Sequence, residues 1–243
     1  MTAIQTINLT KDFKARRAVD SLTLSVNEGE VFALLGTNGA GKTTAIKMLC
    51  CLLAPTSGDA LILGDSVLTS PEAVKQRINL SPQETAVAPK LSVAENLEFM
   101  ARIYGSDKAE ARVRAGKMME TLHLTDRAKD RSKSLSGGMQ RRLSVAMALI
   151  SRPQVVFLDE PTLGLDVGSR RDLWRALKGI RGDTTIVLTT HYLEEAQAHA
   201  DRIGIMHDGR LLAVGTAAEL QLSAGADTLE DAFFAITGTG EER

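Results

Sequence analysis

The sequence predicts an α/β fold built on a parallel sheet that carries a phosphate-binding loop. Three stretches support this prediction: VFALLGTNGAGKTT at 31–44, VVFLDEP at 155–161 and TTIVLTTH at 184–191. Each contains a short apolar run typical of a strand buried on both faces, followed by glycine or polar residues. Open parallel sheets bind ligands at the carboxyl ends of their strands, so a ligand site is expected where these runs end.

Composition limits the classes of function. The 243 residues suffice for one large domain, and 44% hydrophobic residues is ordinary for a globular protein. The net charge of −1 gives no overall attraction to nucleic acid or to anionic membranes, so no nucleic-acid partner is expected. The adjacent Cys50 and Cys51 suit neither a disulfide framework nor a zinc site, which favours a reducing cytosol. The longest apolar run, Met48 to Ala54, is far shorter than the roughly 20 residues of a membrane span. Any membrane role must therefore come through a partner.

Residues 36–44, GTNGAGKTT, match the G-x-x-x-x-G-K-[ST] pattern, with a strand before them and a helix-compatible stretch after them. The glycines permit turns that point N–H groups at a β-phosphate, and Lys42 supplies positive charge to the β and γ groups. The Thr43 hydroxyl can bind Mg²⁺, and the Thr44 amide suits the α-phosphate. A glycine turn with a surface lysine is the alternative. The predicted nucleotide-binding residues of the loop are Gly36, Thr37, Asn38, Gly39, Ala40, Gly41, Lys42, Thr43 and Thr44.

Two further strand ends carry groups suited to phosphate chemistry. Asp159 would hold the magnesium shell, and Glu160 would orient and polarise the attacking water. The alternative for this pair is a strand that ends at a solvated acidic turn. His191 could bond the γ-phosphate and sense its loss, although a lone histidine is more often a cap or a satisfied core group.

A second glycine-rich helix start lies about 100 residues after the first. Leu143, Ala146, Met147 and Ile150 have the spacing of one helix face, which predicts a helix whose first turn begins near Ser136. Exposed N–H groups and glycines at such a start let an anion approach the backbone. Taken alone, the stretch is explained equally well by a glycine loop with a serine cap.

With these motifs, the chain resembles the nucleotide-binding subunit of an ABC transporter over nearly its whole length. The motifs follow the order of that family: the Walker A loop at 36–44, the signature motif LSGGM at 135–139 and the Walker B motif at 155–160. Gln83 in LSPQE resembles the Q-loop glutamine, Asp166 in LGLD the D-loop acid, and His191 the switch histidine. Phe13 occupies the place of an aromatic residue that stacks on adenine, although an ordinary core or edge phenylalanine is the alternative. The D-loop has Gly164 where many relatives have serine or another small residue.

The resemblance implies a P-loop NTPase (RecA-like) core with an antiparallel β subdomain and an inserted helical lobe. Within one ABC ATPase domain at 1–243, it implies a core with the β subdomain at 1–84 and 151–225, a helical subdomain at 85–150 and a carboxyl-terminal tail at 226–243. The cofactors implied are ATP and Mg²⁺. Catalytic roles are implied for Lys42, Gln83, Glu160 and His191, and metal ligation for Thr43, Gln83 and Asp159.

The same resemblance implies the partners. Two copies are expected to pack head to tail, so that the Ser136 hydroxyl and the amides of Gly137 and Gly138 reach the γ-phosphate held by the other copy. The helical lobe would receive a coupling helix from an integral membrane permease, and Gln83 would link that contact to the γ-phosphate. The expected location is cytoplasmic, on the inner face of the cell membrane through the permease.

The remaining elements are predicted from local patterns. Residues 91–105 are predicted to form a helix that opens with a capping box, Ser92 and Glu95. Its apolar face is expected to contain Leu97, Met100, Ala101 and Tyr104. Residues 192–202 suit a short helix, and 203–215 a hairpin that turns near Asp208 and Gly209. The segment TLEDAFFAITG at 228–238 resembles the end of drug and polysaccharide exporter ATPases of the daunorubicin-resistance type. Residues 238–243 are expected to fray.

The predicted function is ATP-driven dimer closure and hydrolysis coupled to export through a separate permease. An alternative keeps the cassette in a soluble assembly, as in DNA repair or translation control. Such proteins usually have tandem cassettes, zinc cysteines or long coiled-coil insertions, and this sequence has none of them. A GTPase or small-molecule kinase is a third alternative, but the guanine-reading N-K-x-D motif is absent. The cargo would be recognised mainly by the permease, and the direction of transport is inferred by analogy.

Overall fold

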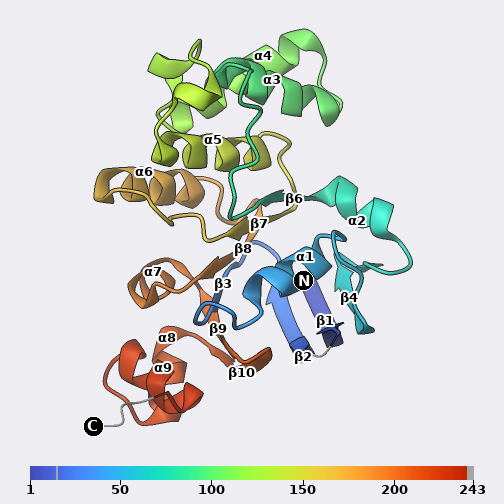
Figure 1. Ribbon diagram of the computed structural model, residues 1–243, viewed down its shortest axis with the longest axis vertical. Helices are drawn as coiled ribbons and strands as arrows, with labels where there is room; N and C mark the ends of the chain where they lie inside the picture. The colour runs from blue at the N-terminus through green and yellow to red at the C-terminus, as the bar shows by residue number, and fades with distance from the viewer. Residues whose placement is uncertain (15, 240–243) are drawn as a thin grey trace.

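The computed structural model describes residues 1–14 and 16–239, which form two β-sheets with helices packed around them (Figure 1). The larger sheet has six strands in the order β10-β9-β3-β8-β7-β6. Its strands are β3 (Val31–Leu35), β6 (Ile78–Ser81), β7 (Val155–Asp159), β8 (Thr185–Thr190), β9 (Arg202–His207) and β10 (Arg210–Gly215). The smaller sheet has four strands in the order β2-β1-β4-β5. Its strands are β1 (Thr2–Phe13), β2 (Arg16–Asn27), β4 (Ser57–Ile62) and β5 (Asp65–Ser66).

The larger sheet confirms the three strands predicted from apolar runs. β3, β7 and β8 are buried at every residue, as expected for strands covered on both faces. They pair in parallel, with Leu35 beside Thr190 and Asp159 beside Thr189. Their carboxyl ends therefore meet at one edge of the sheet. The predicted hairpin is also confirmed, because β10 pairs antiparallel with β9 across the turn at Asp208 and Gly209.

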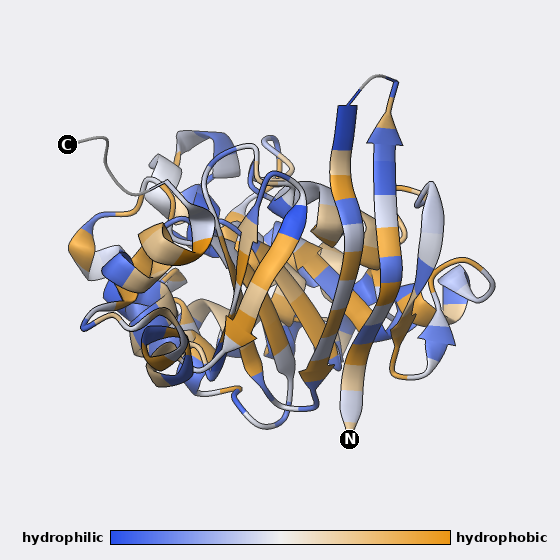
Figure 2. Ribbon diagram, turned by 90° about the horizontal axis from the view of Figure 1, so that it is seen from below, coloured by the Kyte–Doolittle hydropathy of each residue, from blue (hydrophilic) through white to orange (hydrophobic). Residues whose placement is uncertain are grey.

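Helix α1 (Lys42–Leu49) packs between the two sheets. One apolar cluster joins Ile46 and Met48 of α1 to Phe157 of the larger sheet and to residues of β1, β2 and β4. Figure 2 shows the apolar residues concentrated in the interior between these layers, whereas hydrophilic and hydrophobic residues alternate along the outer strands. The start of α1 is thereby fixed against both sheets, at the edge where β3 ends.

The other face of the larger sheet is covered by helices. α5 (Gly137–Leu149) contacts β6 and β7, and α3 (Val93–Ile103) packs on α5 and on α4 (Lys108–Thr121). In Figure 1, α3 and α4 lie on the far side of α5 from the sheet. The remaining helices are α2 (Pro71–Arg77), α6 (Val167–Lys178), α7 (Leu193–His199), α8 (Ala217–Ala224), α9 (Leu229–Thr237) and the short 3₁₀ turns η1 (Thr125–Arg127) and η2 (Ser132–Ser134).

The predicted helix starts agree with the structure, but α3 and α7 end two or three residues earlier than predicted, at Ile103 and His199. Ser92 and Glu95 form the capping box of α3, and Ser136 is the N-cap of α5. Leu97 and Ala101 are fully buried, but the predicted apolar face was too long. Tyr104 is 38% exposed because α3 ends at Ile103 and the chain leaves the helix there.

The fold class is the predicted one: a mixed α/β P-loop core with an antiparallel β-sheet and added helices. The boundaries between the core, the helical subdomain and the carboxyl-terminal tail, at 84/85, 150/151 and 225/226, remain a prediction. Of the segment expected to fray, 240–243 lie outside the described residues, and Gly238 follows α9. Across residues 1–14 and 16–239, no helix combines the length and the apolar character needed to cross a membrane.

Candidate functional site

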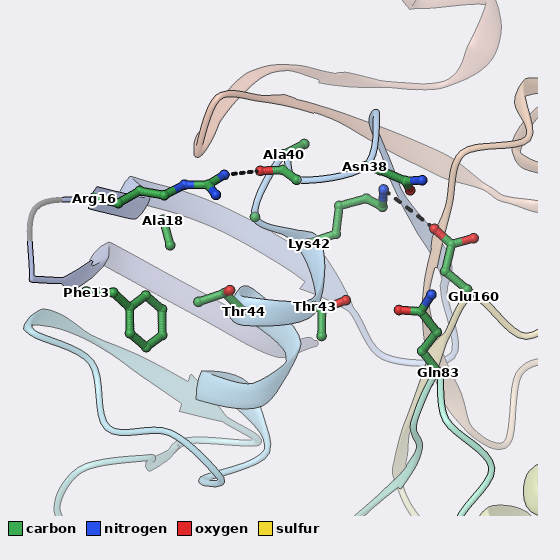
Figure 3. A pocket seen from close by; sticks show the side chains of 12 residues that line it. Phe13, Arg16, Ala18, Asn38, Ala40, Lys42, Thr43, Thr44, Gln83 and Glu160 are labelled. Carbon is green, nitrogen blue, oxygen red and sulfur yellow. Dashed lines mark hydrogen bonds and ion pairs between the residues drawn. The ribbon is translucent and has the colours of Figure 1, made fainter.

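A cleft of about 370 Å³ lies where β3 runs into α1 (Figure 3). Two glycines of the connecting loop are required by close approach of other main-chain atoms. A Cβ at Gly36 would lie 2.2 Å from the Met206 carbonyl oxygen, and one at Gly41 would lie 2.4 Å from that of Ala18. Gly41 also has φ of 101°, which favours glycine. The cleft is lined by Phe13, Arg16, Ala18, Asn38, Gly39, Ala40, Gly41, Lys42, Thr43, Thr44, Gln83 and Glu160.

Lys42 places a buried positive charge in this cleft. Its Nζ donates hydrogen bonds to the carbonyl oxygens of Gly36 at 2.6 Å and Thr37 at 3.1 Å, and lies 3.5 Å from Glu160 Oε1. Burial lowers the pKa of Lys42, and the charge of Glu160 acts in the opposite direction. Figure 3 shows the two side chains pointing toward each other from opposite walls of the cleft.

The two acidic residues are fixed by a buried threonine on the neighbouring strand. Thr189 Oγ1 donates to Asp159 Oδ1 at 2.6 Å and accepts from the Glu160 amide at 2.9 Å. The Thr43 hydroxyl donates to the same Asp159 oxygen at 3.1 Å. Glu160 Oε2 lies 2.9 Å from Nδ1 of His191. The side chains predicted at the three strand ends are therefore connected by hydrogen bonds.

Replacing Thr189 by valine keeps the shape of the side chain but removes both of these hydrogen bonds. The buried Glu160 amide and Asp159 carboxylate would each lose a partner, so we expect the free energy of unfolding to fall by about 1–3 kcal/mol. Urea unfolding would measure this loss as a lower midpoint. Thr189→Ser is the matched control, because serine keeps the hydroxyl. A larger loss for serine than for valine would show that the methyl group matters more than the hydrogen bonds.

Phe13 and Gln83 reach the cleft from its outer walls. Phe13 ends β1 and is 46% exposed, so it is not a core phenylalanine. Its ring lies 5.3 Å from Lys11 Nζ. Gln83 follows β6 and lies beside Glu160 in Figure 3. The structure therefore brings both residues to the cleft, and their roles there remain predictions from the family resemblance.

The oxygen atoms at the inner end of the cleft fit a magnesium ion that also binds phosphate. The Thr43 hydroxyl and an Asp159 carboxylate oxygen are adjacent, and Gln83 lines the same cleft. In the described part of the chain, no group of three or more His, Cys, Asp or Glu residues could hold a metal. Mg²⁺ usually uses one or two protein oxygens together with waters and substrate phosphates, which suits this arrangement.

The second helix start lies apart from this cleft. Ser136, Gly137 and Gly138 are not among the lining residues. The Ser136 hydroxyl caps α5 by accepting from the Met139 amide at 3.3 Å. Asp166, the other residue assigned by resemblance, caps α6 by accepting from the Ser169 amide at 3.0 Å.

Sequence reasoning missed three residues of this region. Thr189 links the two acidic residues. Arg16, at the start of β2, donates a 3.0 Å hydrogen bond to the Gly39 carbonyl oxygen. Arg141 of α5 donates to main-chain carbonyls behind the cleft. An arginine near a helix start is typical of a solvated surface, so no local pattern distinguishes Arg141 from an exposed residue.

Comparison with known proteins agrees with this geometry. The profile of the family described as ABC transporter matches residues 19–163. The daunorubicin/doxorubicin resistance ATP-binding protein of Streptomyces peucetius is 44% identical over 229 residues, which cover 93% of this chain and 69% of that protein.

Two solved structures have the same fold. An ATP-binding subunit of an ABC transporter has a TM-score of 0.89 and 28% identity, covering 97% of this chain and 99% of that one. An ATP-binding cassette solved as a dimer in a post-hydrolysis state, with ADP and phosphate bound, has a TM-score of 0.82 and 26% identity to this chain. The matched region covers 88% of this chain and 98% of that one.

Proposed function

Because this chain belongs to the ABC transporter family and is an ATP-binding ATPase, we propose that it is the motor subunit of an exporter. In this proposal, Mg-ATP closes two copies of the chain head to tail, and hydrolysis reopens them. A separate integral membrane permease carries the substrate.

The observation that carries the proposal is the separation of two phosphate-binding features in one chain. The loop at 36–44 lies in the cleft with Lys42 and Glu160, whereas the helix start at Ser136 lies outside it. A helix N-terminus with exposed N–H groups suits an anion, and the chain's own cleft does not use this one. A second copy placed head to tail would bring Ser136, Gly137 and Gly138 to the γ-phosphate of its partner. The dimeric cassette with bound ADP and phosphate supports dimer formation by such chains.

The contacts in the cleft support a role for each residue. Lys42 and the loop amides would hold the β and γ-phosphates, and the exposed ring of Phe13 would stack on adenine. Glu160, held by His191, would orient the attacking water and receive its proton. Thr43, Asp159 and Gln83 would bind Mg²⁺, which when bound neutralises phosphate charge.

Export rather than a soluble assembly is favoured by the similarity to the daunorubicin/doxorubicin resistance protein of Streptomyces peucetius. The helical lobe of α3 and α4 would contact the permease, and Gln83 would transmit that contact to the γ-phosphate. The chain would then act in the cytoplasm, on the inner face of the membrane. Co-purification with a polytopic membrane protein would support this part of the proposal, and isolation with only soluble partners would favour the alternative assembly.

Ser136→Arg tests the head-to-tail arrangement. We expect the isolated monomer to bind ATP with nearly unchanged affinity, because Ser136 lies outside the cleft. ATP-dependent dimer formation should be lost, because the added side chain and charge would occupy the place of the partner's γ-phosphate. Light scattering with and without Mg-ATP would measure the dimer, and equilibrium dialysis would measure monomer binding.

The matched control is Ser223→Arg, which adds the same charge at an exposed position on α8, far from α5 in Figure 1. It should leave dimer formation unchanged. Loss of ATP binding by the Ser136→Arg monomer would contradict the assignment of Ser136 to the partner's nucleotide.

A further inference from the structure

Arg141 is a buried arginine whose guanidinium group, among residues 1–14 and 16–239, hydrogen-bonds only to main-chain carbonyls. It lies on α5, is 3% exposed, and donates from Nε to the Pro161 oxygen at 3.2 Å and from Nη1 to the Gln83 oxygen at 3.0 Å. The same group also donates to the oxygens of Pro82 and Asp159. Burial lowers the pKa of Arg141, and the nearby charges of Asp159 and Glu160 oppose that effect.

These carbonyls belong to two segments that are far apart in the sequence and lie side by side at the candidate site. Pro82 and Gln83 follow β6, whereas Asp159 and Pro161 lie on either side of Glu160. The side chains of Gln83 and Glu160 both line the cleft. Arg141 therefore holds, from behind, the backbone of the two segments that would meet the γ-phosphate.

Arg141 also belongs to the helix that begins at Ser136. A buried hydrogen bond between the Ser144 and Ser81 hydroxyls, 3.0 Å long, fixes the next turn of α5 to β6. The neighbouring Arg142 extends in another direction and donates to the carbonyl oxygens of Leu122 at 3.1 Å and His123 at 3.4 Å, at the end of α4. α5 is thus bound to the cleft through Arg141 and to the helical lobe through Arg142.

We propose that Arg141 is a positioning residue that couples the γ-phosphate end of the cleft to the N-terminus of α5 in the same chain. The coupling step deepens the proposed function and rests on it, because Ser136 would serve the nucleotide of the partner copy. ATP binding at the site of one copy would then shift α5 of that copy, whose start at Ser136 contacts the nucleotide of the partner copy.

The rigid geometry of the guanidinium group is the physical basis of this coupling. Its donors have fixed directions in one plane, so a shift of either segment breaks hydrogen bonds unless α5 moves with it. Breaking them would leave buried polar groups without partners, which is costly. Moving α5 as a unit is therefore the less costly response to a change at the γ-phosphate.

Hydrogen–deuterium exchange of the α5 amides in a chain that cannot dimerise tests the coupling. In the Ser136→Arg chain, we expect Mg-ATP to slow exchange at residues 139–150 by about fivefold or more, a size typical of coupling between sites. With Arg141→Gln added, the ATP effect on α5 exchange should disappear. The ATP affinity should stay within about threefold of that of the Ser136→Arg chain, a smaller change than the fivefold effect on exchange. The same α5 response in both chains would overturn the proposal.

Two further variants separate coupling from general loosening of the fold. Arg142→Gln removes the other buried guanidinium group of α5, and we expect it to lower the melting temperature but to keep the ATP effect on α5. An equal loss of the ATP effect in Arg142→Gln would show that Arg141 has only a structural role. Arg141→Lys should restore part of the effect, because an ammonium group can still bind some of the carbonyls. If Arg141→Gln does not fold, the lysine variant provides the comparison.

The outcomes also separate this proposal from the proposed function. If the Ser136→Arg chain fails to bind ATP, the assignment of Ser136 to the partner is wrong. The same comparison of Arg141 and Arg141→Gln in a chain with the natural Ser136, diluted until it is monomeric, would still decide whether Arg141 couples the cleft to α5.

Discussion

Glu160→Gln is expected to bind ATP but to lose turnover by about 10²-fold or more, the contribution typical of a general base. Glutamine has nearly the same shape and can still accept a hydrogen bond, but it cannot take a proton from water. Loss of the carboxylate also removes a negative charge near the γ-phosphate. We therefore expect an ATP-bound dimer to accumulate. Steady-state phosphate release would measure turnover, and light scattering would measure the dimer.

The control for this variant is Glu194→Gln, at an exposed acidic residue on α7. Its hydrolysis rate should equal that of the unchanged chain. Normal steady-state hydrolysis by Glu160→Gln would remove Glu160 from the role of base, even though its hydrogen bond to His191 places it well.

Lys42→Ala should weaken ATP binding by roughly 10- to 100-fold, the effect of losing one or two charge-assisted hydrogen bonds to phosphate. The variant also leaves Glu160 without its buried cation, since both side chains are nearly inaccessible. Removal of one partner of a buried pair is destabilising, so we expect a lower unfolding midpoint as well. Equilibrium dialysis with labelled ATP would measure the affinity, and urea unfolding the stability.

Lys47→Ala is the matched control, because Lys47 lies exposed on the same helix. It should change neither ATP affinity nor unfolding to a comparable extent. Unchanged ATP affinity in a folded Lys42→Ala protein would contradict the proposed phosphate-binding role of the loop.

The inner end of the site was predictable from sequence because short-range patterns determine it. A buried strand that runs into glycines and Lys42 has few structural alternatives, and the same holds for the apolar run that ends at Asp159. The start of α5 at Ser136 followed from helix spacing and capping residues.

The rest of the site depends on pairing between distant segments. The sequence gives no local sign that Thr189 bridges Asp159 and the Glu160 amide, because that contact exists only once β7 and β8 are adjacent. Arg141 was missed for the same reason: its partners lie 18–59 residues away in the chain. The bounds of the antiparallel strands β1 and β2 were also not predicted, since the family resemblance implied a β subdomain without its register.

The order of the strands has a consequence for synthesis on the ribosome. β3, which supports the phosphate loop, has β8 and β9 as its neighbours, and both follow it by more than 150 residues in the chain. A nascent chain therefore displays the loop long before either neighbour emerges, and such non-local pairing is slow to form. Nucleotide recognition is accordingly acquired only after β8 and β9 have emerged and paired with β3.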